Sequence, residues 1–185
     1  MPGINRALYE NRTLAKTSSI LGHPCIFLSH ISVDKPAVQR IGDYITQYGD
    51  VDIYLDVIDD DLQRAAARGD AVAVTEFIER GLSNCTHILC LVPASTVRSW
   101  WVPYELGFGK KSGKPLATLK LKDAVDLPAY LEISEIIPGT KSLNVYLTRV
   151  KHGLSKSAAA GSLTKSLMEH TASAHPLDRY LDWQE

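Results

Sequence analysis

The sequence predicts an α/β domain in which helices cover both faces of a parallel β-sheet of about five strands. Short apolar runs of strand length alternate with segments of helical periodicity, at a spacing of about 25–35 residues. The first run, C-I-F-L-S, is continuously apolar up to its final serine, which is typical of a strand buried on both faces. The composition is ordinary for a globular protein, with 45% hydrophobic and 22% charged residues among 185.

The five predicted strands differ in the strength of their signal, which weakens toward the C-terminus. The fourth ends in an alternation of leucine and lysine, which indicates one half-solvated end. We place the strands at residues 25–29, 51–56, 87–92, 115–121 and 133–137.

The segments between the strands carry helix signals. Val38, Ile41 and Ile45 recur at helical spacing. Gly69 can close one short helix, and Asp70 can cap the next. The predicted helices lie at residues 36–49, 62–68, 71–82, 103–111 and 142–154, with a helical turn at 127–131.

Three regions follow from these elements. Residues 1–22 are mixed and polar, and we expect them to form a loosely packed leader. Residues 23–154 form the domain, and residues 155–185 form a helical C-terminal extension with a helix at about 163–170. The end of this extension is too apolar to be disordered and should dock on this domain or on a neighbour, through Leu177, Tyr180, Leu181 and Trp183.

Charge and cysteine usage exclude several classes. The net charge of −1 includes no basic excess for a nucleic-acid partner and no polybasic run for a membrane surface. The N-terminus does not resemble a signal peptide, and the apolar runs are too short to span a membrane. Cys25, Cys85 and Cys90 lack metal-ligand spacing, and we expect Cys25 and Cys90 to be buried. These features favour a protein of the cytoplasm.

Four aspartates after the second strand offer two interpretations. A carboxylate cluster can bind a divalent metal, whereas Asp59 or Asp60 can instead cap the short helix that follows. We favour capping and predict no metal site from Asp56, Asp59, Asp60 and Asp61.

The stretch from 95 to 115 holds the main candidate residue, Glu105. Pro103 fits the first turn of a helix, which would place Glu105 in that turn, where the helix dipole favours an ionised carboxylate. Trp101 lies one turn earlier and could wall one side of Glu105. Gly107 and Gly109 indicate close approach of a strand or ligand. Two interpretations remain: a working carboxylate, or a glutamate on the surface at a helix N-terminus.

Several polar residues follow strand ends, where open parallel sheets bind their ligands. His30, Asp56, Ser95 and Glu105 all come after a predicted strand, so one crevice could collect them. Neither G-x-G-x-x-G nor G-x-x-x-x-G-K is present, so neither standard dinucleotide binding nor P-loop binding is predicted.

Four motifs together resemble the TIR (Toll/interleukin-1 receptor) domain family over roughly residues 24–150. They are F-L-S-H-I-S-V-D-K, I-Y-L-D, R-G-D and S-W-W-V-P-Y-E-L, in this order. The resemblance implies a flavodoxin-like fold. Trp101 and Glu105 match the tryptophan and glutamate of the bacterial and plant-type branch that cleaves NAD, and non-catalytic TIR adaptors usually lack this glutamate.

The resemblance also implies roles for individual residues. Glu105 would be catalytic, and NAD would be the substrate, with no cofactor and no metal. Trp101 would flank the substrate ring, and the substrate would further contact Leu28, Ser29, His30 and Asp56. His30 could equally be a structural histidine.

The implied function is cleavage of NAD with release of nicotinamide and formation of an ADP-ribose-derived signalling nucleotide. The size of the chain resembles that of the TIR subunit of Thoeris antiphage defence, which implies self-association and a separate effector reached by a diffusible nucleotide. Two alternatives remain. One is a non-catalytic TIR–TIR adaptor. The other is an enzyme like the nucleoside deoxyribosyltransferases, because the stretch E-L-G-F-G-K-K-S-G-K-P also resembles the pattern of that family.

Overall fold

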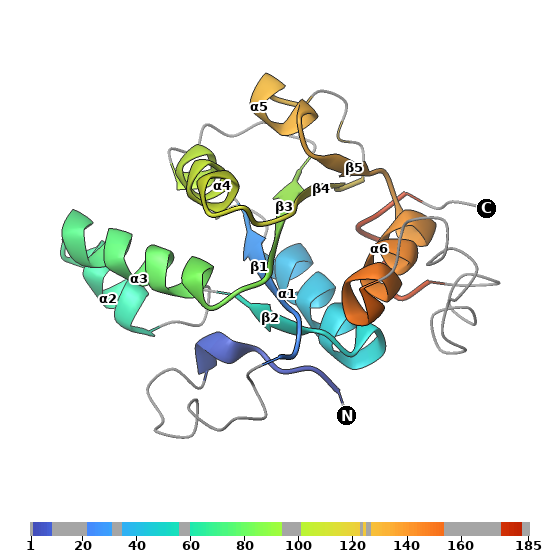
Figure 1. Cartoon of the computed structure of the whole chain (residues 1–185), viewed down its shortest axis with the longest axis horizontal. Coiled ribbons are helices and arrows are strands. Elements are labelled where there is room, and N and C mark those ends of the chain that lie inside the picture. The colour runs from blue at the N-terminus through green and yellow to red at the C-terminus, as the bar shows by residue number, and fades with distance from the viewer. Residues whose placement is uncertain are drawn as a thin grey trace.

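The computed structural model describes residues 2–8, 22–30, 35–55, 60–93, 101–122, 124, 127–153 and 175–182, apart from the side chains of 60–63. Within these ranges, five parallel strands form one sheet in the order β2-β1-β3-β4-β5, which confirms the predicted fold class (Figure 1). The strands are β1 (Cys25–Ser29), β2 (Asp52–Tyr54), β3 (His87–Val92), β4 (Leu116–Lys120) and β5 (Glu135–Ile137).

Helices pack on both faces of this sheet, as the sequence predicts. One face is covered by α1, the π-helical turn that continues it, and α6, and the other by α2, α3, α4 and α5. The helices are α1 (Lys35–Tyr44), the π-helical turn (Ile45–Gly49), α2 (Asp60–Ala67), α3 (Ala71–Ser83), α4 (Trp101–Lys111), α5 (Ala129–Glu132) and α6 (Thr140–His152). Asp70 caps α3, accepting a hydrogen bond from the Ala73 N–H at 3.0 Å, as expected.

Two apolar cores follow from the alternation of side chains along each strand. In β1, Ile26 and Leu28 contribute to the core under α1 and α6, whereas Cys25 and Phe27 contribute to the core under α3 and α4. Phe27 stacks on Tyr54 of β2 with ring centroids 5.7 Å apart. Every residue of β1 is buried, because helices cover both sides of it.

The N-terminal residues 2–8 are tied to β2, so the prediction of a loosely packed leader is wrong for this part. Asn5 forms a parallel bridge with Ile53, and the Arg6 guanidinium pairs with the Asp52 carboxylate at 2.9 Å. A short 3-10 helix, Arg6–Leu8, follows. These partners lie more than 40 positions away along the chain, so local composition does not reveal them.

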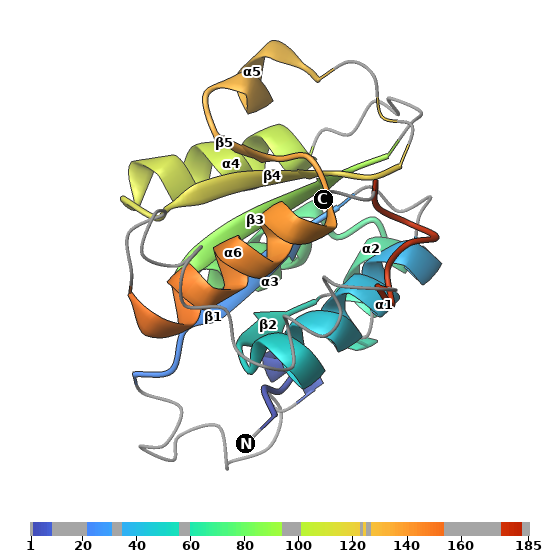
Figure 2. The ribbon, with the colours of Figure 1, turned by 90° about the vertical axis from the view of Figure 1, so that its right-hand side faces the viewer.

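The C-terminal residues 175–182 dock on this domain (Figure 2). Leu177 and Leu181 are fully buried in the core under α1 and α6. The buried Asn144 amide oxygen accepts a hydrogen bond from the Tyr44 hydroxyl at 2.7 Å, and His175 lies against the same Tyr44 ring. This segment consists of turns, whereas the helix predicted at 163–170 and the docking of Trp183 lie outside the described residues.

Among the described residues, no helix combines the length and apolarity required to cross a membrane.

We predict opposite effects on stability from two helical glycines. A Cβ on Gly81 of α3 would lie 2.5 Å from the Tyr54 ring, which the stacked Phe27 holds in place, whereas a Cβ on Gly107 of α4 would meet nothing within 4 Å. Gly81→Ala should therefore destabilise the fold by roughly 1–3 kcal/mol. Gly107→Ala should stabilise it by roughly 0.5–1 kcal/mol through helix propensity. Urea titration measures both, and equal effects would contradict the packing described here.

The C-terminal segment gives a second stability prediction. Leu181→Ala should cost roughly 2–5 kcal/mol in the free energy of unfolding, because it leaves a cavity in the core. Asp182→Ala is the matched control, because that side chain is exposed, and its effect should stay within about 0.5 kcal/mol. Chemical denaturation of both variants provides the comparison. A neutral Leu181→Ala would show that the segment does not contribute to the fold.

Candidate functional site

Helix α4 carries Glu105 toward the sheet. Pro103 lies in its first turn, as predicted, but the described helix begins at Trp101, so Glu105 is its fifth residue and not part of the first turn. Glu105 is only 4% exposed, which rules out the interpretation as a surface glutamate. Its position beyond the first turn weakens the expected contribution of the helix dipole, which falls off within one turn.

The buried face of α4 explains this orientation. Val102, Glu105, Leu106 and Gly109 are its buried residues, and their spacing of three and four places them on one side of the helix. Gly109 lets this side approach β3, because a Cβ there would lie 2.0 Å from Ile88 Cδ1. Of the two close neighbours expected at these glycines, a strand or a ligand, Gly109 has the strand, whereas a Cβ on Gly107 would meet nothing within 4 Å.

The Glu105 carboxylate lies near Cys90 of β3. Burial raises the pKa of the Cys90 thiol to about 12, the nearby Glu105 charge acts in the same direction, and a hydrogen bond with Ser29 opposes them. The thiol therefore stays protonated at neutral pH and is a poor nucleophile. Ser29 and Glu105 thus both lie close to the Cys90 thiol.

Ser29 joins this cluster from the end of β1. Its Cα pairs in register with Cys90, because β1 and β3 are adjacent parallel strands. The residue is 1% exposed, and within the described residues the Cys90 thiol is the one side chain that contacts Ser29 Oγ as a hydrogen-bonding group. Because a thiol is only a weak hydrogen-bonding group, the Ser29 hydroxyl is still able to bind a ligand group.

Tyr130 of α5 approaches the same cluster from outside. Its side chain is 41% exposed, and burial followed by the proximity of Cys90 raises the pKa of its hydroxyl. The cluster of Ser29, Cys90, Glu105 and Tyr130, which we call the Glu105 cluster, thus lies where the sheet order reverses between β1 and β3. Such switch points are the usual ligand sites of open parallel sheets.

Trp101 is the first residue of α4 and is 39% exposed. Its ring contacts Tyr104 edge-on, with centroids 6.0 Å apart, and the Tyr104 hydroxyl donates a hydrogen bond to Glu79 of α3. The indole therefore presents an accessible aromatic surface one helical turn from Glu105.

The structure does not bring the remaining predicted site residues together with Glu105 in one described cluster. Leu28 directs its side chain into the core under α1 and α6, on the face of the sheet opposite Glu105. Half-buried His30 pairs its Nδ1 with the Leu28 carbonyl at 3.1 Å. Asp56 and Ser95 lie outside the described residues.

Two members of the Glu105 cluster were not predicted as site residues. Cys90 reaches Ser29 only through the pairing of β1 with β3, which residue spacing does not reveal. Tyr130 belongs to the helical turn at 127–131, where no sequence pattern distinguished it from a structural residue.

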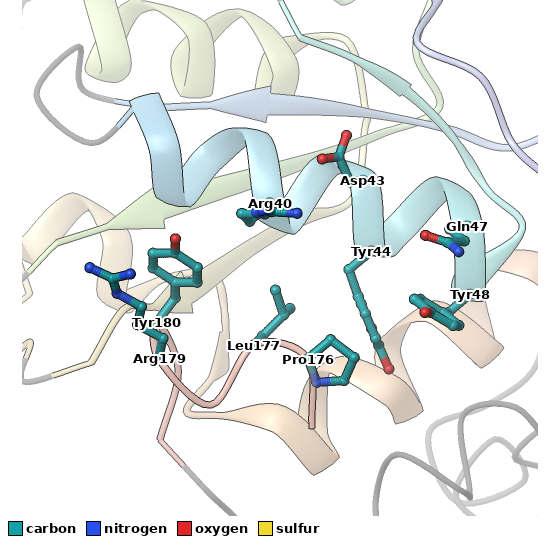
Figure 3. Close-up of a pocket in the computed structure, with 9 residues that line it drawn as sticks. All are labelled: Arg40, Asp43, Tyr44, Gln47, Tyr48, Pro176, Leu177, Arg179 and Tyr180. Atoms are coloured by element: carbon teal, nitrogen blue, oxygen red, sulfur yellow. The ribbon is translucent and has the colours of Figure 1, made fainter. Parts of the chain in front are cut away.

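A separate pocket of about 340 Å³ lies on the other side of the sheet (Figure 3). Tyr44 and Tyr48 line it from α1 and the π-helical turn, and Leu177 and Tyr180 line it from the C-terminal segment. Its walls belong to the core opposite Glu105, so it is not the crevice predicted from the strand ends.

The described residues include no group of three or more histidine, cysteine, aspartate or glutamate side chains suited to hold a metal ion. Asp56 and Asp59 lie outside the described residues, as do the side chains of Asp60 and Asp61.

No protein-family model matches this chain, and no curated protein matches it.

Proposed function

We propose that this chain is an NAD-cleaving enzyme of the TIR type, which releases nicotinamide and forms an ADP-ribose-derived signalling nucleotide. The observation that carries the proposal is the Glu105 carboxylate, buried beside Ser29 and Cys90 at the switch point of the sheet. A carboxylate buried at the ligand edge of an open parallel sheet favours a functional role, because charged side chains are seldom fully buried and ligands bind at this edge.

The chemistry requires one fixed negative charge. When the bond between ribose C1′ and the nicotinamide nitrogen breaks, its electron pair leaves with nicotinamide, which departs neutral, and positive charge develops on the ribosyl centre. A carboxylate held in place stabilises that charge without reorganising. Burial strengthens the effect, because a low effective dielectric screens the charge of Glu105 less than water does.

Neighbouring groups would bind and orient the substrate. The Ser29 hydroxyl, at the end of β1, can donate a hydrogen bond to a ribose oxygen or to the Glu105 carboxylate. The exposed faces of Trp101 and Tyr130 can stack on a nicotinamide or adenine ring. In this assignment Glu105 is the catalytic residue, Ser29 positions the substrate, and the two aromatic rings flank it.

The biological context we propose is bacterial antiphage defence of the Thoeris kind. The nucleotide product would diffuse to a separate effector, and self-association of TIR domains would support activity. Product release as free ADP-ribose, as a cyclic form or as a conjugate depends on which acceptor attacks the ribosyl centre.

One observation favours a second candidate, a TIR–TIR adaptor. Four large apolar side chains are exposed on α4, on α5 and at the residue after α5, and both helices cover the same face of the sheet. Exposed aromatic and apolar residues are enriched where proteins associate. They are Trp101, Tyr104, Tyr130 and Ile133.

Replacing Glu105 tests the enzyme proposal. Glu105→Gln keeps the shape of the side chain but removes its charge, and nicotinamide release from NAD should fall roughly 100-fold or more. The assay is chromatography with mass detection, run at high protein concentration and in lysates of phage-challenged cells. The co-product mass then distinguishes hydrolysis, cyclisation and transfer.

Glu76→Gln is the matched control, because Glu76 is exposed on α3, and it should retain full activity. Thermal unfolding of both variants checks that the fold is intact. Absence of nicotinamide release from the wild type under both conditions would overturn the proposal in favour of the adaptor. Cleavage of deoxynucleosides in place of NAD would favour the deoxyribosyltransferase alternative.

Self-association gives a further expected outcome. Activity per mole of protein should rise with protein concentration, and Ile133→Lys should reduce this rise because it places a charge on the 65% exposed apolar position. Dilution series monitored by NAD turnover and light scattering provide the measurement. Activity strictly proportional to concentration over a wide range would contradict it.

A further inference from the structure

Two buried cysteines face each other at the amino ends of β1 and β3, whereas the Glu105 cluster lies toward the carboxyl ends of these strands. The Sγ atoms of Cys25 and Cys85 are 3.4 Å apart, and their side chains are 0% and 2% exposed. Cys25 opens β1, whereas Cys85 precedes β3, so the pair lies at the amino ends of these strands. We propose that Cys25 and Cys85 are a reversible oxidation site, at which a peroxide converts the two thiols to a disulfide.

The backbone holds the two cysteines in place. The Thr86 N–H donates to the Cys25 carbonyl at 2.8 Å, and the Cys25 N–H donates to Thr86 Oγ1 at 2.9 Å. The neighbouring strands then pair in register from Ile26 onward. A disulfide requires an S–S distance of about 2.05 Å. The two sulfur atoms must therefore approach one another from 3.4 Å to that distance for the disulfide to form.

Two cations lie beside this thiol pair. Burial and the neighbouring Cys25 raise the pKa of the Cys85 thiol, and the charges of Arg6 and Lys114 act in the opposite direction. The Lys114 ammonium donates to the Cys85 carbonyl, and the Arg6 guanidinium donates to the Asn84 carbonyl at 3.0 Å. In the closed structure the Cys85 thiol stays protonated, and once water enters, the cations favour the Cys85 thiolate.

Arg6 controls that access. Besides the Asn84 carbonyl, its guanidinium binds the His23 carbonyl and the Asp52 carboxylate, each at 2.9 Å. Ala7 next to it packs on the core that contains both cysteines. The N-terminal segment thus lies beside the thiol pair, and its local opening would admit a small oxidant.

The reaction balances with hydrogen peroxide as the oxidant. The Cys85 thiolate attacks one peroxide oxygen, the O–O bond breaks, and the departing hydroxide takes up a proton to become water. The Cys25 sulfur then attacks the Cys85 sulfenic acid, and the S–S bond forms as the sulfenic hydroxyl leaves as a second water. The two sulfurs lose two electrons in total, and peroxide is reduced to two waters.

The test is mass spectrometry of the full chain, first reduced and then treated with graded hydrogen peroxide. After alkylation under denaturing conditions, we expect a chain with one alkyl group, whose remaining mass is two hydrogens below that of the reduced chain. Digestion should then give a Cys25–Cys85 crosslinked peptide. Reduction should restore three alkylated cysteines. Cys90 is the internal control, because it is equally buried, and it should remain alkylatable.

Two further measurements sharpen the test. Asp52→Asn should accelerate disulfide formation roughly fivefold or more, because it removes the ion pair that anchors Arg6 but keeps the Arg6 charge beside Cys85. Oxidation should raise the midpoint of thermal unfolding of the wild type by roughly 5–15 °C, because the crosslink closes a long loop. This shift should be absent in Cys85→Ser.

The proposal is overturned if peroxide leaves all three cysteines of the folded wild type alkylatable. It is equally overturned if Cys90 enters the crosslink or if Cys85 oxidises to sulfinic acid without pairing. Because every readout is a mass, an oxidation rate or a melting temperature, failure of NAD cleavage has no bearing on the outcome.

Discussion

The structure depends on the parallel pairing of β1 with β3. This pairing lies at the centre of the sheet, and it assigns alternate side chains of both strands to one core or the other. It also sets the chemistry at the two ends of the strands. At the carboxyl end it joins Ser29 to Cys90 under Glu105, and at the amino end it brings Cys25 toward Cys85.

The two ends differ in what surrounds their polar groups. At the carboxyl end, a carboxylate, a hydroxyl and a thiol share a region bordered by exposed aromatic rings of α4 and α5. At the amino end, two thiols lie beside a segment held by an arginine. Burial keeps the Cys85 and Cys90 thiols protonated, so the carboxylate is the group suited to stabilise positive charge.

Hydrophobic periodicity accounts for how well the elements could be predicted. β1 and β3 match their predicted bounds, and the other three strands lie within theirs. Periodicity does not give the neighbours of a strand, so Cys90 and Tyr130 were absent from the predicted site. The burial of Glu105 was also undecided, because a proline start permits either face of α4. The N-terminal contacts were missed, because Asn5 and Arg6 find their partners about 50 positions later.

The N-terminal segment also protects an edge strand of the sheet from pairing with other chains. β2 is the last strand on its side of the sheet, and such a strand presents unpaired backbone groups to other chains. Here the Ile53 N–H donates to the Ile4 carbonyl at 2.9 Å, and the Asn5 side chain accepts from the Leu55 N–H at 3.1 Å. Residues 2–8 thus occupy the edge of β2 and leave less of it open to edge-to-edge aggregation.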